Sequence, residues 1–99
     1  MKYGLFGKFV AVNGKSKELA DILIQASELL KENEDCLHYV VGLTTDTDDV
    51  WVSEVWNSKE AHDSSLEPEN IRNLIIKARP LIKEMPGGTE YEVLGGKGL

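Results

Sequence analysis

The sequence predicts an α+β fold in which two helices cover one face of a four-stranded antiparallel sheet. Three observations lead to this fold class: helical periodicity in two segments, high strand propensity in four others, and the order β-α-β-β-α-β along the chain. This order is the split βαβ arrangement of ferredoxin-like domains. We expect one such domain over residues 1–99, because roughly 100 residues is an ordinary domain size.

The first half of the chain predicts a strand, a helix and a hairpin. Residues 3–12 are rich in strand formers, and Ser16 is the expected N-cap of the helix that follows. The apolar residues of this helix recur along one face: Leu19, Ile22, Leu23, Ala26, Leu29 and Leu30. Residues 36–45 and 50–56 predict two further strands, which the intervening Asp-rich turn joins into a hairpin.

The second half predicts two helices of different length. Ser58 is expected to cap a short helix that begins at Lys59. Pro68 suits the first turn of a longer helix over residues 69–79. The buried stripe of that helix consists of Ile71, Leu74, Ile75 and Ala78.

The C-terminal segment predicts the last strand. Residues 81–84 follow Pro80, and we expect them to form an extra helical turn before the Pro86-Gly87-Gly88 break. Residues 89–94 then alternate weakly and predict the fourth strand of the sheet.

The first three predicted strands are apolar on both faces. Two helices can cover only one face of a sheet, so the other face needs a second covering layer. We therefore predict a homodimer that packs sheet face to sheet face through an isologous interface.

Composition excludes several functional classes. The net charge of −6 argues against a nucleic-acid partner, which normally needs a basic surface. No apolar run approaches the roughly 20 residues of a membrane span, and no secretory signal follows the start, so a cytoplasmic location is expected. Cys36 is the single cysteine, and neither it nor the two histidines have a spacing typical of metal ligands.

Residues 54–62 are the best candidate site, because a predicted strand here leads directly into a predicted helix. Strand alternation places Glu54 and Trp56 on one face, and the helix places His62 about one turn after Ser58. Each residue also has a purely structural explanation: a histidine near a helix start is often at the surface, and a tryptophan most often serves packing. Their convergence on one cleft would favour a functional site.

Several short motifs in this order resemble the antibiotic biosynthesis monooxygenase family, particularly its small quinol monooxygenase members. The motifs are Cys36-Leu37-His38-Tyr39, Glu54-Val55-Trp56, Ser58-Lys59-Glu60-Ala61-His62, Arg79-Pro80-Leu81-Ile82 and Gly96-Lys97-Gly98-Leu99. The resemblance implies a dimeric ferredoxin-like α+β barrel, usually without metal, flavin or haem. It also implies oxygenation of polycyclic phenols or quinols.

The leading hypothesis from the sequence is therefore cofactor-independent oxidation of a small aromatic phenol or quinol by O₂. We predict that His62 deprotonates the substrate and that Glu54 orients His62 or holds the substrate hydroxyl. Trp56 and Tyr39 are predicted to stack on the aromatic substrate, and His38 completes the predicted substrate-binding set. Two alternatives remain open: a non-catalytic dimer that binds a small metabolite, and an isomerase that uses the same residues to move a proton.

Overall fold

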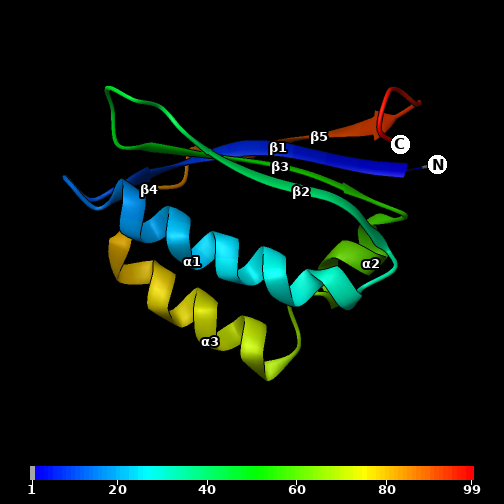
Figure 1. Ribbon diagram of the computed structural model, residues 1–99, viewed down its shortest axis with the longest axis horizontal. Coiled ribbons are helices and arrows are strands. Elements are labelled where there is room, and N and C mark those ends of the chain that lie inside the picture. Colours follow the sequence, from blue (N-terminus) through cyan, green and yellow to red (C-terminus); the bar gives the residue numbers. More distant parts are fainter. Residues whose placement is uncertain (1) are drawn as a thin grey trace.

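The computed structural model describes residues 2–99 and confirms the α+β class, with a five-stranded antiparallel sheet and all helices on one of its faces (Figure 1). The strands are β1 (Lys2–Ala11), β2 (Cys36–Leu43), β3 (Asp49–Trp56), β4 (Ile82–Glu84) and β5 (Gly88–Val93). The helices are α1 (Ser16–Leu29), α2 (Lys59–Ser64) and α3 (Glu69–Ala78), with 3-10 turns η1 (Leu30–Glu32) and η2 (Arg79–Leu81).

Strand β1 is the centre of the sheet. It pairs with β3 on one side and with β4 and β5 on the other, while β2 pairs with the outer edge of β3. The register places Glu54 of β3 between Leu5 of β1 and Tyr39 of β2. Because residues that are directly opposite in a ladder share a face, these three side chains lie side by side under the helices.

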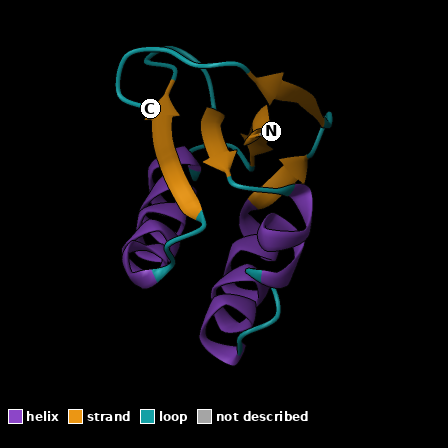
Figure 2. Cartoon of the chain, turned by 90° about the vertical axis from the view of Figure 1, so that its right-hand side faces the viewer, coloured by secondary structure: helices purple, strands orange, loops and turns teal. Residues whose placement is uncertain are grey.

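Helices α1 and α3 lie on the same side of the sheet (Figure 2). Helix α1 packs against the strands, and α3 packs mainly against α1. Leu19 of α1 and Val50 of β3 are fully buried, and Ala78 of α3 joins the same cluster. Trp56, at the end of β3, is also fully buried. No helix within residues 2–99 has both the length and the apolar character that crossing a bilayer requires.

The prediction for residues 81–84 is wrong. The helical conformation ends in η2, and Ile82–Glu84 forms β4, a strand that was not predicted from the sequence. Pro80 explains the end of the helix, since its ring prevents α-helical continuation. The segment then pairs with the free edge of β1. Ala11 pairs with Ile82, and the Val12 amide donates to the Leu81 carbonyl at 2.8 Å. The sheet consequently has five strands rather than four.

The two predicted helix caps have different outcomes. Ser58 caps α2 as predicted, because its Oγ accepts a hydrogen bond from the Ala61 amide at 3.0 Å. Ser16 does not cap α1. It already lies inside the helix, while Lys15 occupies the cap position without a side-chain hydrogen bond. A turn closed by the Lys15 amide and the Val12 carbonyl, 2.8 Å apart, starts this helix instead.

Candidate active site

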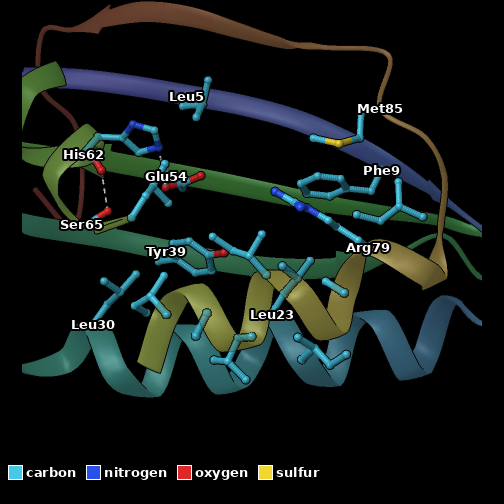
Figure 3. A pocket seen from close by; sticks show the side chains of 18 of the residues that line it. Leu5, Phe9, Leu23, Leu30, Tyr39, Glu54, His62, Ser65, Arg79 and Met85 are labelled. Atoms are coloured by element: carbon cyan, nitrogen blue, oxygen red, sulfur yellow. Dashed lines mark hydrogen bonds and ion pairs between the residues drawn. The ribbon is translucent and has the colours of Figure 1, made fainter. Parts of the chain in front are cut away.

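A cavity of about 440 Å³ lies between the helices and the sheet (Figure 3). Its volume is within the range of small-molecule pockets, about 300–1,000 Å³. Most of the wall is apolar, with Leu5, Phe9, Leu23, Ile71, Leu74 and Met85 among its members. The polar or amphipathic members are Tyr39, Glu54, Trp56, His62, Ser65 and Arg79. A concave, mostly apolar space with a few convergent polar groups is the usual form of a binding site.

Glu54 and Trp56 form one unit at the end of β3. They alternate onto the helix-facing side, and the Trp56 indole Nε1–H donates to Glu54 Oε1 at 3.0 Å. The Glu54 side chain is only 12% exposed. This burial raises the pKa of Glu54, while the hydrogen bond from Trp56 and the nearby His62 oppose the rise.

The short helix α2 aims His62 at this carboxylate. Its Nε2 lies 3.7 Å from Glu54 Oε1, and the imidazole side chain is 15% exposed. The ring also meets the edge of the Trp56 indole, with centroids 5.6 Å apart. A separation of 3.7 Å is longer than a hydrogen bond, so a substrate hydroxyl could approach both groups.

Asp63 holds the other side of the imidazole. Its Oδ1 lies 3.0 Å from His62 Nδ1, and this hydrogen bond is the main reason that the pKa of Asp63 is lowered. A carboxylate only accepts hydrogen bonds, so the contact favours a proton on Nδ1. In the neutral ring, Nε2 is then the free basic nitrogen, and it faces Glu54 and the cavity.

The structure brings four of the five predicted site residues together. Tyr39 lies opposite Glu54 in the β2–β3 ladder and lines the cavity with Glu54, Trp56 and His62. Burial raises the pKa of Tyr39, which keeps its hydroxyl protonated. His38 does not join them. It precedes Tyr39 in β2 and therefore faces away from the helices, in register with Val55.

Ser65 and Arg79 line the cavity but were not among the predicted site residues. Ser65 is buried, and its Oγ donates to the His62 carbonyl at 2.5 Å, which ties the end of α2 to the residue that faces Glu54. Arg79 follows α3 directly, 25 positions after Glu54 in the chain. The sequence held two signals for it: the motif Arg79-Pro80-Leu81-Ile82, and Pro80 itself, which places Arg79 at a helix end.

A metal centre is not evident in the described part of the chain. Within residues 2–99, no group of three or more His, Cys, Asp or Glu side chains is placed to hold a metal ion. The expectation that the protein works without a cofactor stays a prediction.

The fold and the cavity define a small α+β protein with a carboxylate–imidazole pair in an apolar helix–sheet cleft. Comparison with protein families identifies it further: the family model for antibiotic biosynthesis monooxygenase matches residues 3–75. The chain belongs to this family. A search among curated proteins found no match.

Solved structures agree with this assignment. A candidate antibiotic biosynthesis monooxygenase from Chloroflexus aurantiacus J-10-fl is 35% identical, with 97% of this chain and 96% of that chain covered and a TM-score of 0.88. The corresponding candidate from Nitrosomonas europaea shares the fold at 11% identity, with 94% and 90% coverage and a TM-score of 0.85. A third, from Caulobacter crescentus, gives 16% identity, 95% and 91% coverage and a TM-score of 0.84.

Proposed function

We propose that the protein is a cofactor-independent monooxygenase that oxidises a small phenol or quinol with O₂. Family membership supports a monooxygenase-type function. The observation that carries the finer proposal is the pairing of His62 with Glu54, 3.7 Å apart, inside a largely apolar cavity. Such a site suits proton removal from a weakly acidic aromatic hydroxyl.

The reaction needs this proton removal because the substrate itself must reduce O₂. A phenolate gives up an electron far more readily than a neutral phenol. In the overall balance, a phenol and O₂ give a quinone and water: one oxygen atom enters the ring, and the other leaves as water with two hydrogens from the substrate. The substrate supplies all four electrons, and the apolar wall keeps bulk water from the reactive oxygen adduct.

Each cavity residue then has a separate role. His62 Nε2 accepts the hydroxyl proton. Glu54 orients the hydroxyl, and its raised pKa makes its carboxylate a stronger base than an exposed one. Trp56 is fully buried and hydrogen-bonded, so it holds Glu54 in place. Tyr39 is partly buried and lines the cavity, so it contacts the aromatic ring of the substrate.

Oxygen uptake tests the proposal. A screen of hydroquinones and anthrones in an oxygen electrode should find a compound that the wild type oxidises, and His62→Gln should slow it by roughly 10²- to 10⁴-fold, the usual contribution of a general base. Glu60→Gln, an exposed change on the same helix, should leave the rate within about twofold. Full turnover by His62→Gln would refute the role of His62.

The same screen separates the alternatives. Melting-temperature shifts without oxygen uptake would support a binding protein or an isomerase in place of a monooxygenase. Conversion of a compound to an isomer with no oxygen consumed would select the isomerase.

We also propose that the protein is a homodimer, joined through the sheet face opposite the helices, which we call the far face. Phe6 and Trp51 stack there at 5.6 Å, and Val40 and Tyr91 extend the apolar surface. Phe6 is 44% exposed although β1 is the central strand, and Val40 of the edge strand β2 is 52% exposed. A second copy would cover both.

A further inference from the structure

Arg79 is the single lysine or arginine among the residues that line the cavity. Figure 3 shows its side chain running from the end of α3 into the cavity beneath Phe9, with the guanidinium directed toward the end that holds Glu54. Within residues 2–99, Arg79 forms no ion pair, although the protein carries 17 acidic residues.

Arg79 is an exposed residue, yet its side chain also lines the cavity. A long cationic side chain at a helix end commonly covers apolar surface with its stem. The head group of Arg79 lies beside the apolar wall of the cavity (Figure 3). A guanidinium is always charged and binds anionic groups well, and this one has no ion-pair partner within residues 2–99. It is therefore available to an anionic group of a ligand in the cavity.

The rest of the site restricts what that counterpart can be. The protein has a net charge of −6, which repels free anions, so an anionic ligand needs a local cation in order to bind. Glu54 also lines the cavity and would repel an anion placed beside it. An anionic group and a hydroxyl can therefore occupy the cavity together only at opposite ends.

We propose that Arg79 binds a carboxylate on the substrate, at the end opposite the hydroxyl that faces Glu54 and His62. The planar guanidinium offers paired N–H donors that match a carboxylate in a bidentate arrangement. The substrate class is then a hydroxylated aromatic carboxylic acid, with its ring in the apolar middle of the cavity. The placement of a hydroxyl beside Glu54 and His62 rests on the proposed function, whereas the placement of a carboxylate rests on Arg79.

A matched pair of ligands tests the assignment. Binding of 6-hydroxy-2-naphthoate and of 2-naphthol, which lacks the carboxylate, is measured by calorimetry at low and high salt. The wild type should prefer the naphthoate by about tenfold or more, the effect of one charge-assisted interaction that is partly exposed to solvent. Arg79→Gln should abolish this preference and change 2-naphthol binding by less than about twofold. High salt should reduce the preference as well.

Two further variants complete the experiment. Arg79→Lys keeps the charge but not the bidentate geometry, so it should keep part of the preference. Arg72→Gln removes an exposed arginine of α3 that does not line the cavity, and it should behave as wild type. Melting temperatures of all variants verify that they are folded.

The assignment would be wrong if the wild type failed to bind the naphthoate at millimolar concentration. It would also be wrong if Arg79→Gln kept the preference for the naphthoate, or if this variant lost affinity for both ligands equally. These outcomes are independent of oxygen chemistry. If the Arg79-dependent preference is found but no hydroxyaromatic compound is oxidised, the proposed function fails and the carboxylate site stands.

Discussion

At the scale of single residues, the chemistry of the cavity depends on the surroundings of Glu54. A carboxylate that is removed from water becomes a better proton acceptor, because burial disfavours its charged form. The indole N–H of Trp56 limits this effect by donating a hydrogen bond to the same oxygen that faces His62. Glu54 is therefore held in one orientation and kept basic at the same time.

Glu54 should also make stability depend on pH. Burial raises its pKa in the folded protein above the ordinary value of 4.5, so folding favours the protonated form. The favourable contribution is fully present below about pH 4.5 and is lost as pH rises through the folded-state pKa. Glu54→Gln never ionises and retains a carbonyl oxygen for Trp56. Its stability relative to the wild type should consequently increase with pH above 4.5 and then level off.

Urea denaturation at a series of pH values between about 4 and 8 gives the free energies of unfolding that this comparison needs. Glu60→Gln serves as the control, because Glu60 is exposed and forms no ion pair within residues 2–99. A difference between Glu54→Gln and the wild type that stays constant, or that shrinks as pH rises, would contradict the assignment of Glu54 as a buried carboxylate with a raised pKa.

At the scale of elements, the corner between β3 and α2 creates the site. Glu54 and Trp56 are the last helix-facing residues of β3, and Ser58 starts α2 within two residues of the strand end. The first turn of α2 then places His62 over the same face. A helix of six residues is too short to be stable alone, so its position depends on its cap and its contacts.

Removal of the cap should therefore loosen the site. Ser58→Ala deprives the Ala61 amide of its acceptor and should lower the free energy of unfolding by about 1 kcal/mol. Ser64→Ala changes an exposed serine of the same helix and should cost less than about 0.5 kcal/mol. Urea denaturation measures both. Equal stability of the two variants would show that α2 is held by its packing and not by its cap.

At the scale of the whole molecule, the two faces of the sheet differ in what covers them. The helix-facing side contains the core and the cavity, whereas the far face leaves large apolar side chains exposed. Val40 belongs to the far face, because its neighbour Val41 packs against the core. The proposed dimer would bury this face and complete the second layer that the sheet lacks.

Val40→Asp should separate the proposed dimer into monomers, because it would bury a carboxylate among the apolar side chains of the interface. Ile76→Asp is the matched control: Ile76 is 61% exposed on α3, on the opposite side of the molecule from the far face. Sedimentation velocity at micromolar concentration should find a dimer for the wild type and Ile76→Asp, and a monomer for Val40→Asp. A monomeric wild type would refute the dimer.

Local sequence patterns were enough to predict the fold class and the cap at Ser58, and four of the five residues predicted for the site line one cavity. These features are local: strand alternation, helical periodicity and cap chemistry operate over a few residues, and they suffice to place Glu54, Trp56 and His62 on one strand-to-helix corner. Neighbouring residues of a strand point to opposite faces of the sheet, so His38 and Tyr39 lie on different faces and only Tyr39 lines the cavity.

The remaining features depend on contacts between elements that are distant in the chain. Residues 82–84 are a strand because the edge of β1 was available to them, and no local pattern contains that edge. Ser65 and Arg79 line the cavity because α2 packs beside β3 and α3 packs on α1. Contacts between residues distant in the chain depend on the packing of whole elements, and for this reason the cationic end of the cavity became visible only in three dimensions.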